Sequence, residues 1–270
     1  MIKKYDYEGT TLETLEMPNG FDKTIFLIHG ITADFDNLKD ITQKFKDSFN
    51  IYSINLPAHG KSGMSPQLMH IKQFADIIVK YIQDKQLTNI YLIGHSMGGV
   101  LAMLISQRIY DRLNRILLIS PANLTTLDIK DKLEYAFSNS TLMSKITFIK
   151  YSYHKPFKAL LNKEFRANSA KWAEEHKQFF PQYKELGKEL MDESLLKEEG
   201  RLIKKFDKPL GLLCGKSDNI INQKKIYSYF ETVKPNTDIL KVPKCGHNPW
   251  RENKEQTLEA IESFFNNYEK

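Results

Sequence analysis

Residues 89–100 read NIYLIGHSMGGV, and this stretch decides how the chain folds. Its first part, Asn89–Ile93, is apolar throughout, as expected for a strand that is buried on both faces of a parallel sheet. The stretch then passes through a serine flanked by glycines into a helix predicted over Val100–Tyr110. A strand that turns so sharply into a helix is typical of the repeating unit of an α/β fold.

The same alternation of short apolar runs and amphipathic segments extends along most of the chain. It predicts a mostly parallel central sheet covered by helices on both sides. The first 20 residues predict an antiparallel hairpin at the edge of that sheet. The predicted strands are Lys23–Ile28, Asn50–Leu56, Asn89–Ile93, Arg115–Ile119, Pro209–Cys214 and Asp238–Val242. The predicted helices are residues 35–49, a helix with Ser65-Pro66 at its N-cap, Val100–Tyr110, Gln223–Val233 and Gln256–Tyr268.

One long segment breaks this alternation. Residues 122–206 contain helical patterns and no convincing strand, and no crossover between strands needs that length. We therefore expect a core formed by residues 1–121 and 207–270, with residues 122–206 inserted as a helical cap. Long insertions at the carboxyl edge of a sheet usually cover a functional site.

Composition excludes several classes of protein. The 270 residues carry a net charge of +6, but 33 of the 39 cations are lysines spread along the chain, so we predict no nucleic-acid partner. Two cysteines cannot build a disulfide framework, and no metal site is predicted. Neither an apolar secretory signal nor a membrane-spanning run is visible, so we expect a cytoplasmic protein without a transmembrane segment.

The serine of this stretch lies in the pattern G-x-S-x-G, formed by Gly94, Ser96 and Gly98. Turning from strand to helix in about one residue forces the serine into a strained backbone conformation, and side chains at the flanking positions would collide with neighbouring backbone. The hydroxyl of Ser96 is then presented at a helix N-terminus, where a developing negative charge is favoured. We predict that Ser96 is a nucleophile.

A serine hydroxyl needs a base and a group that orients the base. His247 follows the last predicted strand, and Asp218 follows the strand before it, so both should lie at the same sheet edge as Ser96. A carboxylate at Asp218 can accept the imidazole Nδ1–H and fix the tautomer of His247. Asp128, which follows an earlier strand, is the alternative acid.

Backbone amides are expected to stabilise the oxyanion of the reaction. The residues His29-Gly30-Ile31 follow the first parallel strand at the same edge, and Met97 directly follows the nucleophile. We predict that the Ile31 and Met97 N–H groups form the oxyanion hole. Gly30 lets the backbone turn toward the site, and His29 is expected to be a structural hydrogen-bonding residue.

Three further residues near these motifs are expected to support structure. His59 should brace its own loop, and the side chain of His95 should point away from Ser96. Cys245 is expected to be a buried thiol with no part in the chemistry. The alternative is that this thiol, near the site, is sensitive to oxidation.

Taken together, these motifs resemble the α/β-hydrolase superfamily. The similarity covers about residues 23–121 and 207–268, with residues 122–206 in the place of the cap. The resemblance implies a triad of Ser96, His247 and Asp218, an oxyanion hole from Ile31 and Met97, and hydrolysis without a cofactor. The motifs that carry it are His29-Gly30, the stretch Asn55–Ser62, Gly94–Gly98, Gly215 with Asp218, and Gly246-His247. The sequence departs from the common pattern at Ala58, where relatives often have Gly, and at Asn55, where many have Asp.

We therefore expect a serine hydrolase of the carboxylesterase or lipase type that acts on a small-molecule ester through an acyl-enzyme on Ser96. The same triad acting on a thioester, an amide or a C–C bond is the alternative within enzymes, because specificity is determined in the cap. A hydrolase scaffold that only binds a ligand is the alternative from another class. The sequence leaves the oligomeric state open.

Overall fold

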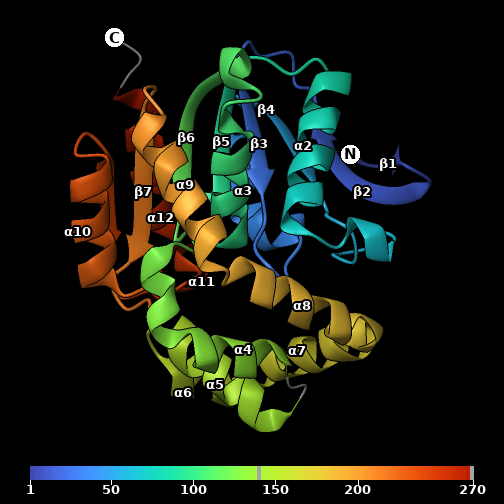
Figure 1. The fold of residues 1–270 in the computed structure, drawn as a ribbon, viewed down its shortest axis with the longest axis vertical. Coiled ribbons are helices and arrows are strands. Elements are labelled where there is room, and N and C mark those ends of the chain that lie inside the picture. The colour runs from blue at the N-terminus through green and yellow to red at the C-terminus, as the bar shows by residue number, and fades with distance from the viewer. Residues whose placement is uncertain (139–140, 268–270) are drawn as a thin grey trace.

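A computed structural model describes residues 1–138 and 141–267. Its centre is an eight-stranded sheet in the order β1-β2-β4-β3-β5-β6-β7-β8 (Figure 1). All pairs from β4 onward in this order are parallel, whereas β1 pairs with β2 and β2 with β4 in antiparallel fashion. This confirms the mostly parallel sheet and the hairpin at its edge. The strands are Ile2–Tyr7 (β1), Thr10–Met17 (β2), Thr24–Ile28 (β3), Asn50–Ile54 (β4), Ile90–His95 (β5), Leu113–Ile119 (β6), Leu210–Gly215 (β7) and Asp238–Val242 (β8).

The central strands β3, β5 and β7 are buried along their whole length, as their uniform apolar sequences predict, whereas β8 at the edge of the sheet is mostly half-buried. In β3, Phe26 and Ile28 belong to one hydrophobic cluster, while the alternating residues Ile25 and Leu27 belong to another. The first cluster packs under α2 (Ile71–Asp84) and α3 (Met97–Ser106), and the second under α1 (Lys39–Phe45) and α12 (Lys254–Asn266). Successive side chains of a strand point to opposite faces, which explains the division.

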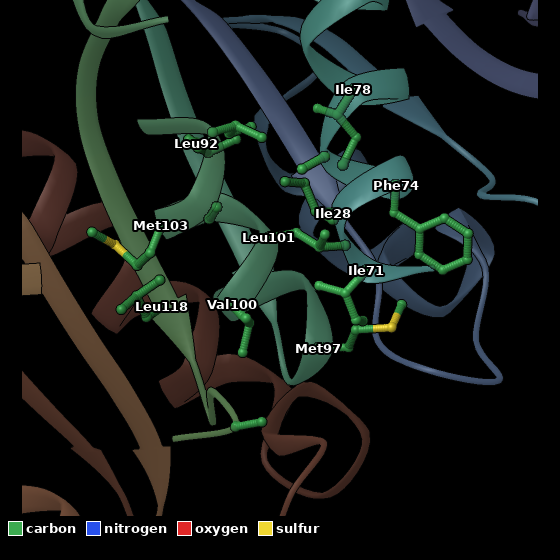
Figure 2. Packing of buried hydrophobic residues seen from close by; sticks show 14 of the residues in the cluster. Ile28, Ile71, Phe74, Ile78, Leu92, Met97, Val100, Leu101, Met103 and Leu118 are labelled. Atoms are coloured by element: carbon green, nitrogen blue, oxygen red, sulfur yellow. The ribbon is translucent and has the colours of Figure 1, made fainter. Parts of the chain in front are cut away.

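The first cluster fixes the position of the helix that follows β5. Figure 2 shows Leu92 of β5 and Leu118 of β6 near Val100 and Leu101 of α3, with Phe74 of α2 farther from β6. All five side chains are fully buried. Burial of such side chains stabilises a fold by roughly 1.5–3 kcal/mol each, so α3 is held firmly against the sheet.

The structure corrects two of the predicted helices. Pro66 begins only a 3-10 turn, Pro66–Leu68, and α2 begins at Ile71, because His70 is extended. The Ser65 hydroxyl donates to Gln67 Oε1 at 2.7 Å and caps no helix. The segment predicted over residues 35–49 is a 3-10 turn, Phe35–Leu38, followed by α1.

Of the other predicted helices, two differ from the structure by a few residues and one agrees with it. Helix α3 begins at Met97, three residues before the predicted start at Val100, because Gly98 and Gly99 are themselves helical. Helix α10 spans Gln223–Val233 as predicted. Helix α12 covers most of the predicted closing helix, whose last residue, Tyr268, lies outside the described residues.

Between residues 122 and 206, the described residues form helices and no strand. Helices α4–α8 form a layer beyond the end of the sheet at which β6 leads into them, whereas α9 runs along the sheet beside α3 (Figure 1). The division into a core and a cap over residues 122–206 stays a prediction. These helices are Lys130–Ser138 (α4), Leu142–Ser152 (α5), Pro156–Leu161 (α6), Lys163–His176 (α7), Phe180–Leu190 (α8) and Glu193–Lys205 (α9), after a 3-10 segment at Leu124–Ile129.

Within the described ranges, no helix is both long and apolar enough to cross a lipid bilayer.

Candidate active site

Ser96 lies at the sharp turn between β5 and α3. Its backbone has φ 55° and ψ −116°, a combination that L-residues rarely adopt. Such a conformation costs on the order of 1–3 kcal/mol and persists only where the surroundings enforce it. Here β5, with six buried residues, and the buried face of α3 enforce it from both sides.

The two flanking glycines make this turn possible. A Cβ atom on Gly94 would lie against the carbonyl oxygen of Gly98, and a Cβ on Gly98 would lie against the carbonyl oxygen of Ile28 in β3. Both would approach to distances that real Cβ atoms essentially never show. The pattern G-x-S-x-G is therefore required by the close packing of the turn against the neighbouring strand.

His247 and Asp218, in the loops that follow β8 and β7, are hydrogen-bonded to each other. The Nδ1–H of His247 donates to Asp218 Oδ2 at 2.9 Å. The other carboxylate oxygen of Asp218 accepts the N–H groups of Ile220 at 2.9 Å and Ile221 at 3.3 Å. Asp218 is 2% exposed and His247 is 4% exposed, so this pair is fixed in position and the proton of the imidazole is assigned to Nδ1.

The loop that carries His247 also contacts the turn that carries Ser96. The Nε2–H of His95 donates to the carbonyl oxygen of His247 at 2.9 Å, and the two rings lie 5.0 Å apart. Ser96 and His247 make no hydrogen bond with each other within the described part of the chain. Hydrogen bonds of catalytic groups are often long without substrate, so the approach of Ser96 to His247 stays a prediction.

Asp128, the alternative acid, has another partner. Its carboxylate forms an ion pair with Lys225 of α10 at 2.8 Å. It lines a cavity of about 500 Å³ whose wall also includes Asp218 and Lys150. The hydrogen bond of His247 goes to Asp218, so the geometry favours Asp218 as the orienting group.

The two predicted oxyanion donors belong to segments that adjoin Ser96. Met97 N–H is at the N-terminus of α3, and Ile31 N–H follows Gly30, on which a Cβ would lie 3.2 Å from Ser96 Cβ. Neither N–H has an acceptor among the residues that the structure describes. Two unpaired amides next to Ser96 are what an oxyanion hole requires.

His29 supports the loop that carries Ile31. Its Nδ1–H donates to Gly30 O at 2.8 Å, and its Nε2 accepts the N–H of Leu56 at 3.2 Å. Burial lowers the pKa of His29, so the ring stays neutral at physiological pH. With both nitrogens occupied, this histidine has no free nitrogen to act as a base.

His59, His95 and Cys245 are all buried. Burial lowers the pKa of both imidazoles well below its usual value. His59 Nδ1 donates to Pro57 O at 2.9 Å. Burial raises the pKa of the Cys245 thiol to about 12, and its Sγ donates to Val242 O at 3.3 Å. A thiol held protonated in this way is a weak nucleophile.

Two contacts at the site have no signal in the sequence motifs. The carbonyl oxygen of Ser152, at the end of α5, accepts the N–H of His247 at 2.7 Å. The carboxylate of Glu252 accepts the N–H of Gly246 at 2.8 Å. The sequence motifs reveal neither residue, because both contact backbone N–H groups and not the side chains of the predicted triad. No three His, Cys, Asp or Glu side chains in the described ranges form a group that could hold a metal ion.

Relatives with similar sequences include proteins named as esterases or lipases. Putative esterase/lipase 2 of Mycoplasma pneumoniae is 29% identical over 110 residues, which are 40% of this chain and 41% of that protein. The match to this relative thus covers less than half of its length. Putative esterase/lipase 1 of the same organism is 24% identical over 260 residues, covering 91% of this chain and 92% of that protein.

Solved structures share the whole fold. An alpha/beta hydrolase enzyme from a Medee basin deep-sea metagenome library superposes with a TM-score of 0.82 at 15% identity, covering 97% of both chains. An esterase from Exiguobacterium antarcticum gives a TM-score of 0.80 at 18% identity, covering 98% of this chain and 99% of that one. The sequence profile of the alpha/beta hydrolase fold matches residues 23–202. The chain therefore belongs to the α/β-hydrolase fold family.

Proposed function

We propose that the protein is a serine hydrolase that cleaves carboxylic esters, in the manner of a carboxylesterase or lipase. The observation that carries the proposal is the 2.9 Å hydrogen bond between His247 and Asp218, two buried residues that follow β8 and β7, which run parallel to β5. A buried carboxylate on Nδ1 leaves the other imidazole nitrogen, Nε2, free to accept a proton. The relatives named as esterases or lipases support the same reaction class.

The proposed reaction has two stages. Ser96 Oγ attacks the ester carbonyl carbon while His247 Nε2 takes the hydroxyl proton, and the Ile31 and Met97 amides stabilise the tetrahedral oxyanion. His247 then gives the proton to the departing alcohol, which leaves an acyl group on Ser96. Water then gives a proton to His247 and attacks the acyl carbon, and His247 returns the proton to Ser96 Oγ as the C–O bond breaks and the carboxylic acid leaves. Asp218 stabilises the charged imidazole throughout.

The same groups would attack a thioester, an amide or the C–C bond of a diketone-like substrate, and these stay the alternatives. A second alternative is a scaffold that binds a ligand without turnover. The hydrogen bond between His247 and Asp218 supports turnover over binding alone, because a site that only binds a ligand needs no oriented base.

A substrate panel tests the proposal. Aryl esters with increasing acyl length should be hydrolysed by the wild-type protein, alongside a matched thioester and a matched amide. Ser96→Ala should abolish turnover of every compound while the thermal unfolding curve keeps its shape. Ester hydrolysis that persists in Ser96→Ala would contradict the proposal, and cleavage of the amide or thioester alone would replace the ester assignment.

A further inference from the structure

A short segment of the predicted cap lies across both loops of the candidate active site. The carbonyl oxygens of two consecutive residues, Tyr151 and Ser152, accept hydrogen bonds from these loops. Asn219, next to Asp218, donates to Tyr151 O at 2.9 Å, and His247 donates its own N–H to Ser152 O at 2.7 Å. The acid loop and the base loop are thus held by the same turn of chain at the end of α5.

Glu252 provides a second connection between the base loop and the cap. It lies at the end of α11 (Pro249–Glu252), five residues after His247. Its carboxylate accepts the N–H of Gly246 at 2.8 Å, the N–H of His154 at 3.0 Å and the N–H of Lys155 at 3.3 Å. One carboxylate therefore joins the residue before His247 to two residues of the cap.

Three features make this connection rigid. Hydrogen bonds from N–H groups to a carboxylate are roughly twice as strong as those between neutral groups. Among the described residues, no lysine or arginine pairs with Glu252, so the backbone amides provide the partners of its charge. A Cβ on Gly246 would lie against Ser152 O, so the base loop and the cap segment are in direct backbone contact.

We propose that Glu252 is a positioning residue that holds the catalytic base in place by tying it to the cap. The inference rests on the proposed function, because it gives His247 the role of base. Asp218 fixes the imidazole of His247, Ser152 fixes its backbone N–H, and Glu252 fixes the preceding Gly246. Two of these three constraints connect the base loop to the segment Tyr151–Lys155. It follows that this part of the cap stays attached during turnover, and that any opening of the cap occurs elsewhere.

Glu252→Gln tests the inference, with Glu255→Gln on the exposed side of α12 as the matched control. The glutamine has one acceptor oxygen and an NH₂ group that repels the N–H donors it meets. The assay is the rate of covalent labelling by a fluorophosphonate, separated into probe affinity and the rate constant of bond formation. A second readout is the low-field NMR resonance of the His247 Nδ1 proton, which depends on the hydrogen bond to Asp218.

We expect Glu252→Gln to lower the rate constant of bond formation at least 10-fold, with probe affinity within about 3-fold of wild type, and to broaden the Nδ1 resonance. Glu255→Gln should change neither. Glu252→Asp keeps the charge on a shorter side chain, so its rate constant of bond formation should fall less than that of the glutamine variant. If the glutamine variant does not fold, Glu252→Asp is the variant that tests the inference. An unchanged rate constant and a sharp Nδ1 resonance in a folded Glu252 variant would overturn the inference, as would a loss confined to probe affinity.

Failure of the proposed function gives a different result. If wild-type protein is not labelled, the assignment of Ser96 as a nucleophile fails. The Nδ1 resonance still reports in that case whether Glu252 holds His247 against Asp218, because it needs no reaction at Ser96.

Discussion

The replacement of Asp218 by asparagine should disable the base without disturbing the fold, and the structure specifies how. One oxygen of Asp218 accepts two backbone N–H groups, from Ile220 and Ile221, and the other accepts His247 Nδ1–H. Asparagine has one oxygen and one NH₂ group, so only one of these two sets of donors can be satisfied by the oxygen.

The two backbone donors decide the orientation of the asparagine. Turning its NH₂ toward Ile220 and Ile221 would leave two buried N–H groups without acceptors, at a cost of about 1–3 kcal/mol each. If the two orientations differ by only about 2 kcal/mol in free energy, the one with the oxygen toward Ile220 and Ile221 is still favoured by roughly thirty to one. The NH₂ group then faces His247 Nδ1 and donates to it, which moves the imidazole proton to Nε2. An imidazole protonated at Nε2 cannot take the proton of Ser96.

The expected loss is therefore about 10⁴-fold in the rate of ester hydrolysis, equivalent to about 5 kcal/mol in the activation free energy. The assay compares kcat/KM on an aryl ester at neutral pH for the wild type and Asp218→Asn, with thermal unfolding as the check of the fold. Asp128→Asn is the matched control, because the Asp128 carboxylate pairs with Lys225. A small decrease of kcat/KM in Asp218→Asn together with a large decrease in Asp128→Asn would refute the assignment of Asp218 as the acid.

Two further predictions concern stability. Gly98→Ala should lower the free energy of unfolding by about 1–3 kcal/mol and slow fluorophosphonate labelling, because the new Cβ would press on the Ile28 carbonyl oxygen; urea unfolding that matches wild type would contradict this. Burial alone would raise the pKa of Glu16, but hydrogen bonds from Lys85 and Lys3 lower it to about 2. The charged carboxylate therefore adds its full contribution to the free energy of unfolding above pH 4.5, and this contribution is lost as the pH falls toward 2. Glu16→Gln should therefore be less stable than wild type by on the order of 2 kcal/mol at pH 6, and the difference should shrink toward zero near pH 2 in urea titrations at each pH; a difference independent of pH would count against it.

The fold could be predicted from sequence because its signals are local. The uniform apolar strands, such as Ile90–Ile93, identify a sheet that is buried on both faces, and the structure confirms this class of fold. Gly94 and Gly98 indicate the turn at Ser96 in the sequence, because a side chain at either position would collide with neighbouring backbone. Residues that follow parallel strands share one edge of the sheet, which brings Asp218 and His247 together.

Other features depend on contacts that no local pattern contains. Ser65 and Pro66 have the sequence of a helix start, yet the extended backbone of His70 delays α2 to Ile71. Glu252 resembles any polar residue at a helix end, and its role depends on backbone amides almost a hundred residues away in the chain. The sequence shows that both the donor and the acceptor exist, but only the folded structure shows that they are in contact.

The most direct test of the central claim, that Ser96 is the nucleophile of a hydrolase, is to map the site of the fluorophosphonate adduct. The protein is treated with the probe, digested, and the modified peptide is sequenced by mass spectrometry. We predict a single adduct on Ser96, its loss in Ser96→Ala, and a strongly reduced yield in Asp218→Asn. An adduct on another serine, or an equal yield in Ser96→Ala, would contradict the account.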